Sequence, residues 1–187
     1  MIFTPVLLGT LYNNIGSFVF SAIIDSMRPE ILRFKISDEV KYKKNMSRLF
    51  GIVLYLSIIQ SIFVSVFAKI ILYIMYGSDY MGATSTLQII IWYTSFSYFG
   101  AVRNVWILAE EKQKYLWIIT LVGMVANIGL NIVLIPAHGI NGAALATLLT
   151  QLFTNVILNY FVKPFNDVNK LAIKGLNIKH MISNRRF

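Results

Sequence analysis

The sequence predicts an all-α, polytopic membrane helix bundle with about five transmembrane helices. Of its 187 residues, 57% are hydrophobic and only 13% are charged, about half the charged share of an ordinary globular domain. Several apolar runs reach the roughly 18 to 20 residues that cross the hydrocarbon core of a bilayer. Because these runs do not alternate strictly between apolar and polar residues, we expect helices rather than the strands of a barrel.

The five expected spans cover about 2–24, 50–76, 83–108, 116–135 and 140–162. The first has no preceding Lys or Arg and no small-residue cleavage site, so it is predicted to be a helix rather than a signal peptide. A long charged connection, "DSMRPEILRFKISDEVKYKKNMSR", follows it. Pro136 and Gly139 predict a tight turn between the last two spans. We expect one transmembrane bundle over 1–163 and a basic cytoplasmic tail over 164–187.

The basic residues predict the orientation of the bundle. Fifteen of the 17 Lys and Arg residues fall in the long charged connection, in "AEEKQK" and from Lys163 onward, whereas "GSDYMG" and "PAHGING" hold none. The positive-inside rule therefore places the amino terminus outside and the tail in the cytoplasm. The net charge of +9 indicates topology rather than a nucleic-acid partner. The tail also suits anionic lipid head groups, although its amphipathic pattern is irregular.

Small and polar residues recur at helical spacing within the spans. Gly142, Ala146 and Thr150 form a stripe suited to close helix packing. A neighbouring stripe carries Gln151, Asn155 and Asn159. Amide side chains are costly against lipid, so they are expected to face other helices or a wet cavity.

These patterns give a candidate substrate pathway made of Arg103, Asn104, Asn127, Asn131, Gln151 and Asn155. For the four amides other than Asn104, helix packing and pathway lining both fit. An arginine within a span is a candidate for binding an anion, but Arg103 lies near the inner end of its helix and also has the reach to snorkel to the interface. The other cation within a span, Lys69, is expected to snorkel to the outer interface.

Catalytic chemistry leaves no comparable pattern, so the chain is not expected to be an enzyme. His138 and His180 are the only histidines and there is no cysteine. Neither metal-ligand spacing nor a phosphate-binding glycine loop occurs. We expect no metal and no cofactor.

One long segment resembles a known family. "YFGAVRNVWILAEEKQKYLWIITLVGMVANIGLNIVLIPAHGINGAALATLLTQ", residues 98–151, is similar to the late helices of bacterial polysaccharide (O-antigen) flippases, which belong to the MATE-like multidrug/oligosaccharidyl-lipid/polysaccharide superfamily. The residues that match the family pattern there are Trp106, Leu108, Ala109, Glu110, Gly123, Asn127, Leu130, Asn131, Leu134, Ile135, Pro136, Gly139, Gly142, Ala143, Ala144, Ala146 and Thr147. Upstream, "YIMYGSDYMGATSTLQIIIW" also fits, and the resemblance covers most of residues 15–160.

The resemblance implies transport of a polyprenyl-diphosphate-linked oligosaccharide to the outer leaflet of the bacterial cytoplasmic (inner) membrane. Members of this family have about twelve helices in two lobes around a cationic cavity. The five spans here resemble the last five, in part of the carboxyl-terminal lobe. The chain is therefore expected to need an amino-terminal lobe or partner chain, because alternating access requires two lobes that move about a shared site. The resemblance also implies that Arg103 contacts the diphosphate or an acidic sugar and that the amide side chains form hydrogen bonds with sugar hydroxyls.

Two alternatives remain from the sequence. One is a multidrug or other lipid exporter of the same superfamily, which is expected to carry carboxylates inside its helices for ion coupling; no Asp or Glu lies inside any of the five spans. The other is a membrane subunit that does not transport and only packs against a partner. All three hypotheses share membrane lipids as the surroundings of the chain.

Overall fold

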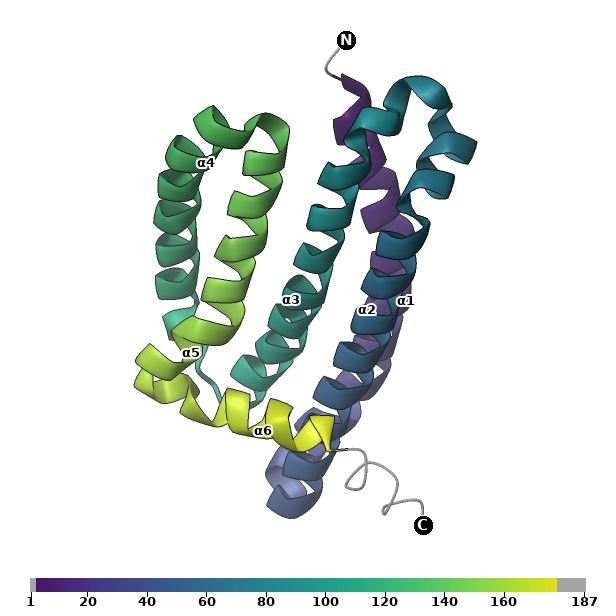
Figure 1. Cartoon of the computed structure of the whole chain (residues 1–187). Helices are drawn as coiled ribbons and strands as arrows, with labels where there is room; N and C mark the ends of the chain where they lie inside the picture. Colours follow the sequence, from purple (N-terminus) through teal and green to yellow (C-terminus); the bar gives the residue numbers. More distant parts are fainter. Residues whose placement is uncertain (1–2, 178–187) are drawn as a thin grey trace.

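The chain forms an all-helical bundle in the computed structural model, which describes residues 3–177 and their side chains from residue 18 onward. Figure 1 shows long helices standing side by side, with one short helix lying across their lower end. The elements are α1 (Phe3–Ser37), α2 (Glu39–Tyr76), α3 (Thr84–Ala109), α4 (Leu116–Leu152), α5 (Leu158–Phe161) and α6 (Asn166–Leu176). Short 3-10 turns at Ser78–Ala83, Gln113–Tyr115 and Lys163–Phe165, and a π turn at Phe153–Ile157, connect or extend them.

The element α4 is a hairpin whose two arms, 116–138 and 140–152, lie side by side (Figure 1). The chain reverses at Gly139, which has φ 56° and ψ −131°, a backbone conformation that residues with a Cβ rarely adopt. Pro136 remains within the first arm. The expected turn between the last two spans is therefore confirmed, and it lies three residues after the proline.

The prediction of a long charged connection between the first two spans is wrong. Helix α1 continues through Pro29 to Ser37, and α2 begins at Glu39, so almost all of residues 25–48 are helical. The side chain of Asp38 caps α2 by accepting hydrogen bonds from the backbone N–H groups of Val40 (3.1 Å) and Lys41 (3.0 Å). The segment holds seven Lys and Arg residues and two Met residues, and these residue types have good helix propensity. The high charge of this segment therefore did not distinguish a loop from a helix.

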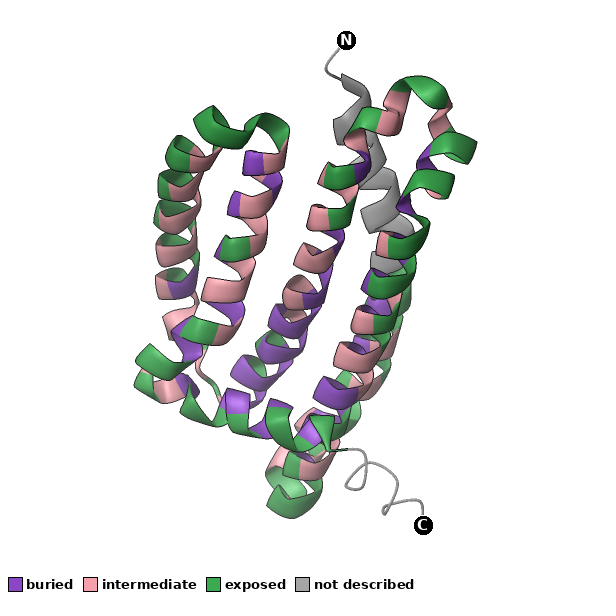
Figure 2. Ribbon diagram, viewed as in Figure 1, coloured by how far each residue is buried: buried purple, intermediate pink, exposed green. Residues whose placement is uncertain are grey.

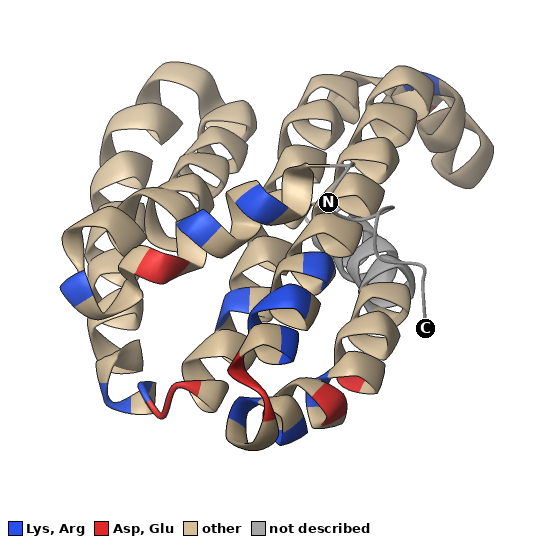
Figure 3. Cartoon of the chain, turned by 90° about the horizontal axis from the view of Figure 1, so that it is seen from below, with Lys and Arg blue, Asp and Glu red and all other residues tan. Residues whose placement is uncertain are grey.

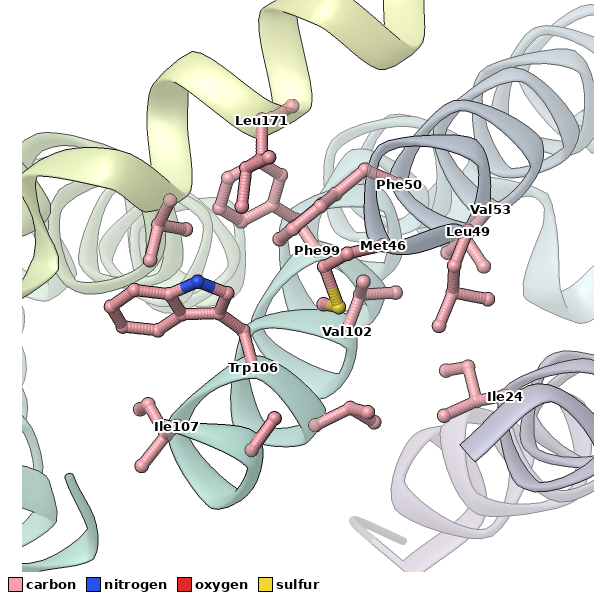
Figure 4. Close-up of a cluster of buried hydrophobic side chains, with 14 of the residues drawn as sticks. Ile24, Met46, Leu49, Phe50, Val53, Phe99, Val102, Trp106, Ile107 and Leu171 are labelled. Atoms are coloured by element: carbon pink, nitrogen blue, oxygen red, sulfur yellow. The ribbon is translucent and has the colours of Figure 1, made fainter. Parts of the chain in front are cut away.

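The main core lies where α1, α2, α3 and α6 meet (Figure 4). Met46 and Phe50 of α2 contact the same cluster as Val102 and Trp106 of α3, and all four are 0–1% exposed. Leu171 enters this cluster from α6. The tail was expected to be separate from the 1–163 bundle, but its first part, α6, belongs to the bundle. Residues 178–187 of the expected tail lie outside the described residues.

Much of the remaining helical surface is exposed (Figure 2), and many of the exposed side chains are large and apolar. Among the described residues, two helical stretches, Glu39–Tyr76 and Gln113–Phe161, are long and apolar enough to cross a membrane. Of the most apolar 18 residues in the second stretch, only 6% are buried. Met124, Val125 and Ile132 there are 53%, 60% and 68% exposed. Apolar patches of this extent mark surfaces that contact lipid or other proteins.

The two ends of the bundle differ in charge. Figure 3 views the end that carries α6 and shows most of the Lys and Arg positions there. We call this the basic end. The opposite end holds the turns at Ser78–Ala83 and Gly139. Among the expected spans, 83–108 agrees with α3 to within one residue at each boundary, and the described part of the first span, residues 3–24, lies within the longer α1.

Candidate functional site

Arg103 of α3 is buried between helices in the basic half of the bundle. Its side chain is 4% exposed, and its Nη1 donates a 2.8 Å hydrogen bond to the backbone carbonyl of Thr154. Its Nε is buried without a hydrogen-bond partner, and no carboxylate among the described residues forms an ion pair with it. A buried guanidinium with one neutral partner is costly to desolvate. The snorkelling position expected as one alternative is not the one that Arg103 occupies here.

The partner carbonyl of Arg103 belongs to the π turn Phe153–Ile157. A π turn adds one residue to the helical ladder, which frees a backbone carbonyl from its usual helical partner. The two elements also approach closely one turn earlier on α3. A Cβ built on Gly100 would lie 2.5 Å from Oδ1 of Asn155, so only glycine leaves room for that amide. Asn155 in turn donates to Oε1 of Gln151. The structure thus brings Arg103, Gln151 and Asn155 together.

A chain of amides continues from this point to α6. Asn159 donates to the backbone oxygen of Asn155 (2.5 Å) and to Oδ1 of Asn169 (3.2 Å). Asn169 donates to the backbone oxygen of Val156 (3.0 Å). Asn159 and Asn169 are 1% and 4% exposed. The amide spacing in the last span pointed to Asn159, whereas no sequence signal distinguished Asn169 or the carbonyl of Thr154.

The other predicted pathway residues lie elsewhere. Asn127 donates to Oγ1 of Thr150 (3.2 Å), which links the two arms of α4. Asn131 donates to the backbone oxygen and Oδ1 of Asn127, both at 2.9 Å. Asn104 is exposed, on a different side of α3 from the buried Arg103. Asn127 and Asn131 therefore bond within the hairpin, and Asn104 does not join the Arg103 group.

The three predicted packing residues are buried in the second arm of α4. A Cβ on Gly142 would lie 2.0 Å from the backbone oxygen of Leu134, so the arms touch backbone to backbone at this point. Ala146 is 0% exposed, and Thr150 donates a 2.7 Å hydrogen bond to its backbone oxygen. Small residues here allow the close approach of the arms.

A second polar group ties three helices together at the basic end. Oε1 of Glu110, just after α3, accepts hydrogen bonds from Nζ of Lys35 on α1 (2.8 Å) and from the hydroxyl of Tyr42 on α2 (2.9 Å). Burial, and then the bond to Glu110, raises the pKa of Tyr42 well above its ordinary value. Burial lowers the pKa of Lys35, but the hydrogen bonds and charges of Glu110 and Glu39 together outweigh it, so the pKa is raised overall.

We expect Glu110→Gln to lower the free energy of unfolding by about 1 kcal/mol at neutral pH, because a partly exposed ion pair to Lys35 is lost. Since the pKa of Lys35 is raised on folding, the stabilisation is fully present at neutral pH and disappears only as the pH rises through that raised value. Thermal unfolding of the full chain in detergent measures the change. Glu111→Gln is the matched control, because its neighbouring side chain is exposed and forms none of these bonds. Equal effects of the two variants would contradict the assignment.

The described residues give no sign of a metal centre. No group of three or more His, Cys, Asp or Glu lies close enough among them to hold a metal ion. His138 is exposed beside the turn at Gly139, and His180 lies outside the described residues. What the arrangement offers chemically is a buried cation with unfilled hydrogen-bonding capacity, flanked by amides.

Comparisons of the chain with protein-family models, with curated proteins and with solved structures found no match.

Proposed function

We propose that this chain is the carboxyl-terminal part of a flippase that moves a polyprenyl-diphosphate-linked oligosaccharide across the bacterial cytoplasmic membrane. The observation that carries the proposal is the buried guanidinium of Arg103, which has one neutral partner, a free Nε and amide neighbours. The likeness of residues 98–151 to the late helices of polysaccharide flippases, described above, agrees with this assignment. The broad exposed apolar surface of α4 supports a position in lipid.

In this proposal Arg103 exchanges one partner for another during transport. In the conformation described, the guanidinium bonds the carbonyl of Thr154, which is uncharged. A diphosphate oxygen makes a shorter, charge-assisted hydrogen bond that is roughly twice as strong. Binding therefore requires the hairpin of α4 to part from α3 at the π turn, so that phosphate replaces the carbonyl. Asn155 on this turn and Gln151 just before it then offer their amides to sugar hydroxyls.

The proposed orientation places the basic end in the cytoplasm and the turn at Gly139 outside. The concentration of Lys and Arg at the basic end supports it (Figure 3). With that orientation Arg103 lies in the cytoplasmic half of the membrane, where a lipid-linked substrate is first met. A second lobe, on a partner chain or a longer form of this one, completes the cavity.

The test compares Arg103→Met with Lys69→Met in cells that make the chain with its partner lobe. We expect Arg103→Met to lower surface polysaccharide about 30-fold or more, because truncating one member of a desolvated charged pair costs about 2 kcal/mol or more. Its unfolding temperature should stay equal or rise, because an apolar side chain of similar length replaces a buried charge that lacks a counter-ion. Lys69→Met removes an exposed cation at the other end and should change neither.

Three results would contradict the proposal. Unchanged surface polysaccharide in Arg103→Met cells, at normal protein abundance, would remove Arg103 from the pathway. Unchanged surface polysaccharide after deletion of the chain would exclude the flippase itself and favour a subunit that does not transport. A defect in drug resistance in place of polysaccharide export would point to the multidrug alternative.

A further inference from the structure

Helix α6 lies across the basic end, where it connects the hairpin side of the bundle with α2 (Figure 1). One stripe of the helix is buried against the bundle: Val168, Leu171, Ala172 and Gly175 are all inaccessible or nearly so. The contact with α2 is close, because a Cβ on Gly175 would lie 2.2 Å from the backbone oxygen of Ser47 and 2.8 Å from the nitrogen of Gly51. The hydroxyl of Tyr55 also bonds the backbone oxygen of Leu176. This helix is therefore fixed along its length.

The outer surface of α6 has two different flanks. At 100° per residue, Ile173 and Leu176 lie on one side of the buried stripe, while Lys170 and Lys174 lie further round the helix. Ile173 is 62% exposed and Leu176 is 41% exposed. The side chain of Lys170 is 71% exposed and pairs with Asp167 at 3.1 Å. Apolar side chains beside cations on a helix that lies flat are typical of helices at a membrane interface.

Cations of α2 extend the charged flank. Because Gly175 touches Ser47, Lys174 lies next to the turn of α2 that carries Lys44 and Arg48. In the part of the chain that the structure describes, Lys44, Arg48 and Lys174 form no ion pair. We call Lys44, Arg48, Lys170 and Lys174 the α6 basic surface. Figure 3 shows α6 and this part of α2 at the same end of the molecule.

We propose that the α6 basic surface binds the head groups of anionic phospholipids in the cytoplasmic leaflet. The contact between Gly175 and Ser47–Gly51 sets α6 at the level where the apolar part of α2 begins, near residue 50. A bilayer around α2 therefore has its head groups at the height of α6. Ile173 and Leu176 enter the acyl boundary there, and the unpaired cations meet phosphate oxygens. This inference rests on the membrane location within the proposed function, and it requires no transport.

The experiment uses the full chain, purified in neutral detergent and titrated with phosphatidylglycerol or phosphatidylcholine, with bound lipid counted by native mass spectrometry. We expect phosphatidylglycerol to bind more tightly. Combining Arg48→Gln with Lys174→Gln should weaken that binding by about fivefold per removed cation, less at high salt. The matched control combines Lys41→Gln with Lys43→Gln, which removes the same charge from α2 further from α6. The control should bind like the original chain.

Hydrogen exchange in nanodiscs locates the bound lipid. Amides of 166–176 should exchange more slowly in phosphatidylglycerol nanodiscs than in phosphatidylcholine nanodiscs, and the Arg48/Lys174 double variant should lose this difference. Equal affinity for the two lipids, or equal loss in the double variant and its control, would overturn the lipid site while leaving the flippase proposal standing. A chain that is monomeric without detergent would overturn both. Normal lipid binding by the purified chain, together with unchanged surface polysaccharide after its deletion from cells, would overturn only the flippase.

Discussion

Gly142→Ala is expected to destabilise the hairpin of α4 by about 2–3 kcal/mol, although it adds only one methyl group. The new Cβ would lie 2.0 Å from the backbone oxygen of Leu134, 2.5 Å from its carbonyl carbon and 3.0 Å from the nitrogen of Ile135. These are backbone atoms, so no side-chain rotation relieves the clash, and the two arms must separate. Separation also stretches the 3.2 Å bond between Asn127 and Thr150.

The matched control is Gly129→Ala in the first arm of the same hairpin. A Cβ at Gly129 meets nothing within 4 Å. Because alanine favours helix over glycine by up to about 1 kcal/mol, this control should be neutral or stabilising. Equilibrium unfolding of the full chain in detergent measures both variants. Effects of the same sign at Gly129 and Gly142 would show that the arms do not pack as described.

Gly175→Ala is expected to release α6 from α2. Its Cβ would meet the backbone oxygen of Ser47 at 2.2 Å and the nitrogen of Gly51 at 2.8 Å. The displaced helix would expose Val168 and Leu171, which are 0% and 6% exposed in the fold. Uncovering two such side chains costs about 3 kcal/mol or more. Hydrogen exchange should show faster exchange across 166–176, with α3 little changed.

Gly82→Ala serves as the control for this variant, because a Cβ there also meets nothing within 4 Å and the residue lies at the opposite end. It should leave the exchange of α6 unaltered. Protection of α6 that survives Gly175→Ala would contradict the close contact between α6 and α2. Loss of protection throughout the chain, instead of in α6 alone, would mean that α6 is needed for the whole bundle to fold.

The helical class and the positions of the long helices were predictable from the apolar runs, because a chain that crosses a lipid bilayer satisfies its backbone hydrogen bonds by forming a helix of about that length. The boundaries of 83–108 and the reversal near Gly139 followed from clear changes in composition and from one glycine. Residues 25–48 were misassigned for the opposite reason. A charged segment is well hydrated both as a loop and as a helix, so its composition does not distinguish the two. Only the capping side chain of Asp38 marks where α1 ends and α2 begins.

Part of the candidate site was predictable and part was not. Helical spacing placed Gln151, Asn155 and Asn159 on one stripe, and these residues form a connected chain. The partner of Arg103 is a backbone carbonyl in a π turn, and such a turn leaves no mark in the residue types. Asn104 was grouped with Arg103 because they are adjacent, but neighbours on a helix point about 100° apart. Burial therefore separates them.

The continuity of α2 has a mechanical consequence. At 1.5 Å per residue, its 38 residues span about 57 Å, well beyond a hydrocarbon core of roughly 30 Å. Since α1 and α2 meet at Asp38 without a loop, the part of α2 that exceeds this thickness is a rigid helical extension rather than a flexible linker. In the membrane position proposed above, a tilt of about 10° about the middle of the apolar part of α2 would move the charged end of the helix about 6 Å sideways, so a small movement within the bilayer becomes a larger one in the aqueous phase.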